Sequence, residues 1–172
     1  MSNAINPSQN VAFNLIGVNN NPSNPTSMLM EIAQKHKLNF NPDNLQLDFH
    51  GKRISPELLA KIADLARQSG KSNNPITLKN LNLSDLDLSE VNLSGLNMPG
   101  ANLSGANLKD ANLKDAKLER ANLNNANLTG ADLTGTNLMN ADLTGAFLRG
   151  AILSNTDLTG ADLTGATLPR DD

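Results

Sequence analysis

Few residues of this chain have both the type and the spacing that enzymatic chemistry needs. His36 and His50 are the only two histidines, and neither has an obvious catalytic partner at a fixed spacing. Serine and threonine are frequent, as at Ser84, Thr134 and Thr164, but they recur at one position of a repeat, where turns account for them. The chain has no cysteine, no glycine-rich phosphate loop and no zinc or EF-hand spacing. The sequence therefore predicts a protein that is not an enzyme and that holds no cofactor and no metal.

The charge balance excludes several classes of partner. The 14 lysine and arginine residues face 17 aspartate and glutamate residues, a formal net charge of −3, whereas proteins that follow a phosphate backbone need a basic excess. No nucleic acid is therefore expected as a partner. No apolar run reaches the roughly 18 residues of a membrane span, and the N-terminus lacks the basic and apolar regions of a Sec-type signal peptide. One mixed stretch predicts a solvated face that neutralises itself: Lys109, Asp110, Lys114, Asp115, Lys117, Glu119 and Arg120.

The polar residues of the C-terminal part are positioned by a five-residue repeat. The 95 residues from Ile76 to Arg170 form nineteen consecutive units of the approximate pattern Ala-(Asn/Asp)-Leu-x-x. Alternation places the first and middle residues of a unit on one side of an extended chain and the polar residue between them on the other. The fifth residue is Gly, Asn or Asp in sixteen units, and these types tolerate the positive φ of a turn. A short extended piece and a turn in every unit close a square coil after four units.

This pattern resembles the pentapeptide-repeat family over residues 76–170. The resemblance implies an all-β solenoid, a right-handed quadrilateral β-helix, with the middle leucine and the first-position alanine of each unit pointing inward. Twenty residues per coil give about 4.75 coils. The alanine fits this reading because a square coil is narrow and close packing leaves room only for a small side chain beside the leucine.

The chain divides by composition into three parts. Residues 1–26 are rich in Asn, Pro and Ser and are expected to be disordered, because they offer little apolar surface to offset the entropy of ordering. Residues 27–70 form a small, mainly helical α/β segment in our interpretation, and residues 71–172 contain the repeat. In the middle part we expect a helix from about Met28 to Lys37, a strand over 45–49 with a turn at Gly51, and a helix over 56–69.

The helix over 56–69 is predicted to cap the N-terminal end of the rod. Its apolar residues Leu58, Leu59, Ile62 and Leu65 follow a helical spacing, and stacked architectures need a covering element at their ends. The first five units carry large residues where later units carry alanine, which predicts an apolar junction with this helix. These residues are Ile76, Leu81, Leu86, Val91 and Leu96.

The C-terminal coils predict an interaction surface. Phe147 and Ile152 occupy second positions, where other units carry Asn or Asp, and Met139 is a third outward apolar residue of the same coil. Leu168 belongs to a last coil that we expect to have no cap. Apolar groups gathered beside an open end are typical of a contact surface, so we predict a homodimer formed end to end through these coils.

The first functional hypothesis is an interaction rod that acts as a secreted effector. Pentapeptide repeats behind a small N-terminal segment resemble type III secretion effectors of enteric bacteria, whose export signals are charge-poor and rich in Ser and Asn. Residues 1–26 have this character, and the first charged residue of the chain is Glu31. The rod would then bind a host protein, after transfer from the bacterial cytoplasm into the host cell.

Two other hypotheses remain open. A scaffold that stays in the bacterial cytoplasm would need no export signal, and residues 27–70 would then serve only as a cap. A DNA-mimicking protein that binds gyrase would resemble the quinolone-resistance branch of the family. That branch is typically more acidic, with Phe at many middle positions, whereas here every middle residue is leucine except Met98.

Overall fold

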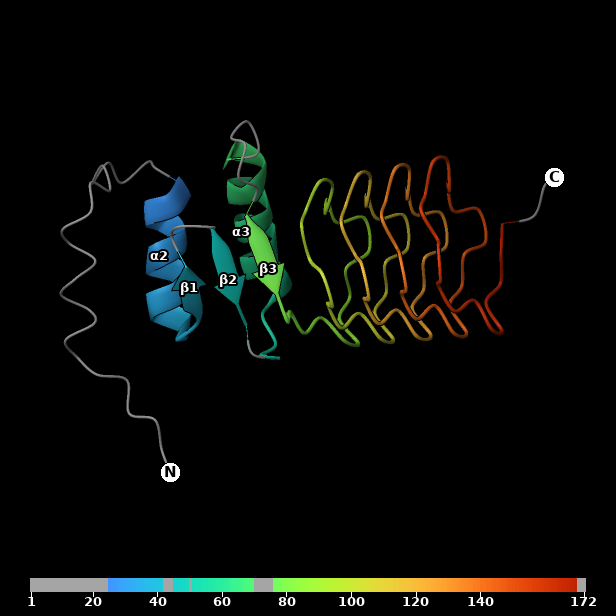
Figure 1. Cartoon of the computed structure of the whole chain (residues 1–172), viewed down its shortest axis with the longest axis horizontal. Coiled ribbons are helices and arrows are strands. Elements are labelled where there is room, and N and C mark those ends of the chain that lie inside the picture. Colours follow the sequence, from blue (N-terminus) through green and yellow to red (C-terminus); the bar gives the residue numbers. More distant parts are fainter. Residues whose placement is uncertain (1–24, 42–44, 50, 70–75, 170–172) are drawn as a thin grey trace, which may run out of the picture.

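The computed structural model describes residues 25–41, 45–49, 51–69 and 76–169. Two helices, α2 (Pro25–His36) and α3 (Pro56–Ser69), and three short strands, β1 (Asn39–Asn41), β2 (Gln46–Asp48) and β3 (Thr77–Lys79), come first along the chain. A stack of coils follows β3, so that the molecule extends from α2 at one end to the last coil at the other (Figure 1).

Both helices have local sequence signals at their ends. At the start of α3, Ser55 Oγ accepts a hydrogen bond from the Leu58 N–H at 3.2 Å, and Pro56 occupies the first helical position. At the end of α2, Lys37 has a φ of 52°, and the Leu38 N–H donates to the Ala33 carbonyl at 2.8 Å, which closes a Schellman motif. The two helices therefore span nearly the ranges that the sequence predicts.

The three strands form one sheet in the order β1-β2-β3. β1 pairs with β2 antiparallel, and β2 pairs with β3 parallel, with Leu47 opposite Leu78. β2 lies inside the predicted strand over 45–49, and the predicted turn at Gly51 has a φ of 71°. The sequence did not predict β1, because its three residues Asn39–Asn41 have no recognisable strand pattern.

The repeat closes a coil every 20 residues. Parallel bridges join second-position residues one coil apart, as in Asn102 to Asn122 and Asn122 to Asp142. The Leu103 N–H donates to the Asn122 carbonyl at 2.7 Å, and the Asn122 N–H donates to the Ala101 carbonyl at 2.9 Å. Each coil is therefore bonded to the next through the backbone, on all four sides.

The core of the rod is built from the middle and first residues of the units. All the middle residues from Leu78 to Leu148 are at most 2% exposed. Thr136 is the one buried polar residue of the described chain, and its hydroxyl donates to the Leu113 carbonyl at 2.8 Å. The inward direction of both positions thus agrees with the alternation in the sequence.

The segment before the repeat lies directly against the first coil. Besides the pairing of β2 with β3, Arg53 bridges to Asn82, and its Nη2 donates to the Ser84 carbonyl. From α3, Arg67 Nη1 donates to the Asn92 carbonyl at 2.9 Å. These contacts connect the segment to three of the first four units of the repeat.

The apolar residues of this junction belong to one continuous core cluster. In α3, Leu59 and Ile62 are fully buried and Leu65 is 3% exposed, while Leu58 is only partly buried. Among the large first-position residues, the cluster buries three and packs against the other two. The buried ones are Ile76, Leu81 and Leu96, and the partly buried ones are Leu86 and Val91.

Candidate interaction surfaces

The described residues give no sign of a catalytic or metal centre. They contain no group of three or more His, Cys, Asp or Glu side chains that could hold a metal ion. His36 lies at the end of α2, where its carbonyl accepts a bond from Lys52 Nζ at 3.4 Å, and His50 lies outside the described residues. None of the described helices has the length and apolar character needed to cross a bilayer.

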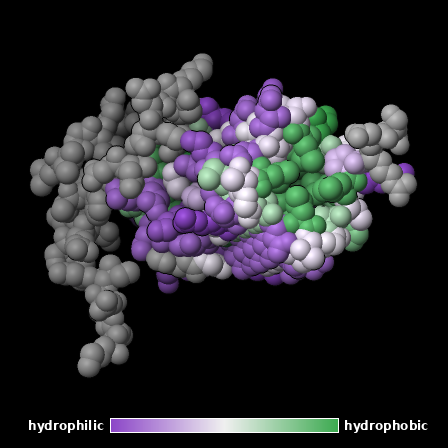
Figure 2. All heavy atoms as spheres, turned by 45° about the vertical axis from the view of Figure 1, so that its right-hand side comes forward, coloured by the Kyte–Doolittle hydropathy of each residue, from purple (hydrophilic) through white to green (hydrophobic). Residues whose placement is uncertain are grey.

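Three large apolar side chains are exposed in the last two coils. Phe147 is 49% exposed, Ile152 is 50% exposed and Leu168 is 51% exposed. Phe147 and Leu168 line one shallow hollow of about 300 Å³, together with Arg149. Figure 2 shows hydrophobic atoms gathered toward this end of the molecule. We call Phe147, Ile152 and Leu168 the C-terminal patch.

Phe147 and Ile152 interrupt regular columns of polar side chains. In one column, Asn107 Nδ2 donates to Asp87 Oδ1 at 2.9 Å and Asn127 Nδ2 donates to Asn107 Oδ1 at 3.2 Å. Phe147 takes the next place in this column, because Asn127 bridges to it. Ile152 takes the corresponding place after Asp132 in the adjacent column. The two side chains therefore lie on adjacent sides of the same coil.

Met139, the fourth residue of the predicted surface, lies apart from the C-terminal patch. It is partly buried and lines a groove together with residues of β2 and β3. The sequence placed Met139 in the correct coil, but it did not reveal the groove that Met139 lines.

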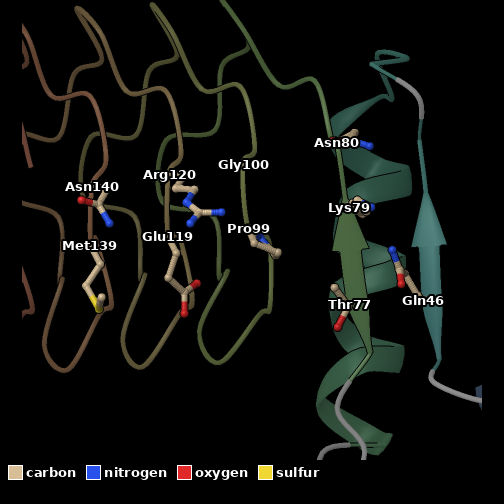
Figure 3. Close-up of a pocket in the computed structure, with 10 residues that line it drawn as sticks. All are labelled: Gln46, Thr77, Lys79, Asn80, Pro99, Gly100, Glu119, Arg120, Met139 and Asn140. Carbon is tan, nitrogen blue, oxygen red and sulfur yellow. The ribbon is translucent and has the colours of Figure 1, made fainter.

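The groove of Met139 has a volume of about 440 Å³ and runs along the rod from β2 across four successive levels of the stack (Figure 3). We call it the Lys79 groove. Its lining residues are Gln46, Thr77, Lys79, Asn80, Pro99, Gly100, Glu119, Arg120, Met139 and Asn140.

Arg120 is the unusual residue of the Lys79 groove. It is a fifth-position residue with a φ of 58°, a left-handed conformation that long side chains rarely adopt. The Arg120 side chain extends toward the coil of Gly100, while the Glu119 side chain points away from Arg120 (Figure 3). Glu119 Oε1 accepts a bond from Asn137 Nδ2 at 2.9 Å. The only sequence signal for this site is an arginine where sixteen units carry Gly, Asn or Asp.

The mixed-charge stretch does not form one face, so that prediction is wrong. Consecutive units lie on consecutive sides of the coil, and the bridge columns place Asn107, Asn112 and Lys117 on three different sides. The charged residues that belong to these units are distributed accordingly. In this stretch, only Lys109 and Asp110 form a described ion pair, at 3.8 Å.

The second-position aspartates have a structural role in the turns. Asp132 Oδ1 and Asp157 Oδ1 each accept a bond at 2.9 Å from the amide of the threonine two residues later. The hydroxyl of the following serine or threonine, and then its amide, lower the pKa of four of these carboxyl groups below the usual value. They are Asp87, Asp132, Asp157 and Asp162. In each of the four, Oδ1 therefore already serves the turn.

Comparison with known proteins identifies the repeat. The family model described as "Pentapeptide repeats (8 copies)" matches residues 77–110, 106–145 and 137–169, together more than half of the chain. A comparison with curated proteins found no match.

Several solved structures are similar to the chain. A pentapeptide repeat protein from the thylakoid lumen of Arabidopsis thaliana is 34% identical, with a TM-score of 0.52, over 56% of this chain and 69% of that one. Rfr23 from the cyanobacterium Cyanothece 51142 is 40% identical, with a TM-score of 0.31, over 54% of this chain and 60% of that one. HetL from Nostoc sp. strain PCC 7120, which is involved in heterocyst differentiation regulation, is 29% identical, with a TM-score of 0.23, over 56% of each chain.

Proposed function

The chain belongs to the pentapeptide-repeat family, and from this premise we propose that it is a non-enzymatic rod that binds another protein through the C-terminal patch. Its repeat forms the right-handed quadrilateral β-helix of that family. The observation that carries the proposal is the exposure of Phe147, Ile152 and Leu168 in a rod whose other outward positions are mostly polar.

The partner that best fits the C-terminal patch is a second copy of the chain. The patch lies at the end of the rod, so a twofold axis through this end would place each patch against its counterpart, as in most homodimers. The strand edges of the last coil would be covered in the same contact. Uncovered edges promote association through the backbone, and this adds to the attraction between the apolar side chains.

Sedimentation velocity over a range of protein concentrations tests the dimer. The double variant Phe147→Asn/Ile152→Asn restores the residue type that the repeat carries at these positions, so it should fold normally and remain monomeric. Asn112→Asp is the matched control, because it changes a second-position residue in the column of Ile152, two coils away from it. A wild-type chain that stays monomeric at millimolar concentration, or a double variant that associates as the wild type does, would contradict this proposal.

Delivery of the rod into a host cell is the finer part of the proposal. It is supported only by the composition of residues 1–26, which are rich in Asn, Pro and Ser and carry no charged side chain. Residues 1–30 fused to a translocation reporter should enter host cells from a bacterium with a working type III apparatus and should remain inside a strain without it. Retention in both strains would support a scaffold of the bacterial cytoplasm instead.

A further inference from the structure

We propose that the Lys79 groove binds an extended acidic segment of a partner protein, with its carboxylates held by Lys79 and Arg120. This inference does not depend on the C-terminal patch, because none of the three patch residues lines the groove. It assigns a second interaction site to the rod and defines the chemistry of the segment that would occupy it.

The first argument is the charge of this side of the rod. The side is formed by the units that begin at Ile76, Leu96, Ala116, Thr136 and Thr156, as the bridges between them show. Its charged residues in the repeat are the cations Lys79, Lys117 and Arg120 and the acids Glu119 and Asp157, and β2 adds Asp48 opposite Lys79. On each of the other three sides, the described acidic residues outnumber the basic ones. Cations and acids therefore balance on this side, and of the four sides it repels an acidic ligand least.

The second argument is that the two cations at the groove are available. Lys79 and Arg120 are exposed, and neither forms an ion pair with any residue that the structure describes. The adjacent carboxylate of Glu119 is occupied by Asn137 and points away from Arg120 (Figure 3). The guanidinium of Arg120 can therefore donate to an external carboxylate, and such pairs are often bidentate.

The third argument is the backbone strain at Arg120. Holding a residue with a Cβ in the left-handed region costs on the order of 1–2 kcal/mol, and glycine at this position would avoid that cost. The turn of every unit requires this conformation but does not require an arginine, so the fold alone does not favour this residue type at the groove. Among the described fifth positions of the repeat, Glu90 is the other long side chain, with the same φ of 58°, but it does not line the groove.

The shape of the groove favours an extended peptide. Its floor is open at Gly100, where an added Cβ would meet nothing within 4 Å. Pro99 and Met139 add apolar surface along the floor. Coils stack at roughly 4.8 Å, so the three steps from Lys79 to Met139 span about 14 Å, the length of about four extended residues. An acidic segment with an apolar residue among its carboxylates matches this lining.

The test is fluorescence polarisation with a labelled peptide of the sequence Ser-Glu-Leu-Glu-Ser-Glu-Leu-Glu, compared with the same peptide carrying Gln in place of Glu. The wild-type protein should bind the Glu peptide more tightly, and added salt should weaken this binding. Arg120→Gly should weaken binding about tenfold, as expected for the loss of a charge-assisted bond. The same variant should raise Tm by about 2–4 °C, because the strain is removed.

Two control variants separate the groove from general effects. Glu90→Gly removes the same backbone strain on another side, so it should raise Tm similarly and should not weaken binding. Lys109→Gln removes one cation outside the groove and should leave the affinity within about twofold of the wild type. Equal binding of the two peptides, equal effects of Arg120→Gly and Lys109→Gln, or tighter binding of an oligo-dT strand than of the Glu peptide would each overturn the proposal.

Discussion

At the scale of single residues, the fifth position of each unit combines a left-handed backbone with close contact between coils. Every described fifth residue from Asn80 to Gly165 has a positive φ. At five of the glycines, the carboxylate or amide oxygen of the aspartate or asparagine one coil earlier occupies the place that a Cβ would take: Gly105, Gly130, Gly135, Gly145 and Gly160. Gly130 beneath Asp110 is the tightest such pair. Gly95, in contrast, has nothing within 4 Å of that place.

Gly130→Ala should therefore destabilise the rod more than Gly95→Ala does. Both substitutions introduce left-handed strain on the order of 1–2 kcal/mol, but only the first also displaces the Asp110 side chain. Unfolding in urea at equilibrium measures the difference between the two variants. In an Asp110→Gly background the excess cost of Gly130→Ala should disappear, and an excess that persists there would contradict the explanation.

The turn aspartates make the stability of the rod dependent on pH. The hydroxyl of Thr159, and then its amide, lower the pKa of Asp157 in the folded state. A carboxyl group with a lowered folded-state pKa contributes stability above its unfolded value of about 3.9, and this contribution is lost as the pH falls through the folded value.

Asp157→Asn should reduce the loss of stability on acidification, because the amide oxygen still accepts the turn bond and no longer titrates. The measurement is Tm at pH 7 and at pH 3 for wild type and variant. The reciprocal change is Asn92→Asp, since Asn92 Oδ1 accepts bonds from the amide and hydroxyl of Ser94. This variant should lose more stability between the two pH values than the wild type, and an unchanged or smaller loss would refute the assignment.

At the scale of elements, we infer that α3 and β2 cap the first coil. Ile62 of α3 is fully buried in the core cluster that continues into the rod, whereas Leu58, one turn earlier, is only partly buried. Ile62→Ala should cost about 2–5 kcal/mol of unfolding free energy, and Leu58→Ala clearly less. Urea unfolding followed by circular dichroism checks both values. If α3 is a cap, Ile62→Ala should also lower the midpoint at which the repeat itself unfolds, and a rod midpoint equal to that of the wild type would argue against a cap.

The elements differ in how far the sequence alone could predict them. The repeat predicts the coil, because every unit has the same alternation of inward and outward residues. The start of α3 is predicted by its N-cap residue, Ser55. The parallel pairing of β2 with β3 could not be predicted from the repeat. The repeat pairs residues 20 positions apart, whereas Leu47 lies before the repeat and its separation from Leu78 does not follow this period. β1 is defined only by its pairing with β2.

The two candidate surfaces also differ in how far the sequence alone could predict them. Phe147 and Ile152 break two columns of Asn and Asp, so the sequence reveals them directly. The Lys79 groove requires residues of β2, β3 and three further coils to be placed side by side. Its shape depends on the empty space beside Gly100, and no local sequence pattern predicts that space.

At the scale of the whole molecule, the stack is a one-dimensional array whose units contact mainly their neighbours, so stability should vary along it. Middle leucines such as Leu128 are fully buried, while Leu158 and Leu163 of the last coil are only partly buried. Leu128→Ala should therefore cost about 2–5 kcal/mol and Leu163→Ala markedly less. Comparable losses for the two variants in urea unfolding would show that the last coil is better covered than the single chain suggests.

Hydrogen exchange tests both the variation of stability along the rod and its self-association. The amide of Asn122 donates to the Ala101 carbonyl inside the stack, and the amide of Thr167 donates to the Ala146 carbonyl in the last coil, both at 2.9 Å. In the monomer the Thr167 amide should exchange faster, because opening the last coil exposes it without unfolding the rod.

If the C-terminal patch forms the dimer, raising the protein concentration should slow exchange at Thr167 and leave exchange at Asn122 nearly unchanged. Phe147→Asn/Ile152→Asn should abolish this concentration dependence. Exchange at Thr167 that is independent of concentration in the wild type would mean that the last coil is not covered by a second copy.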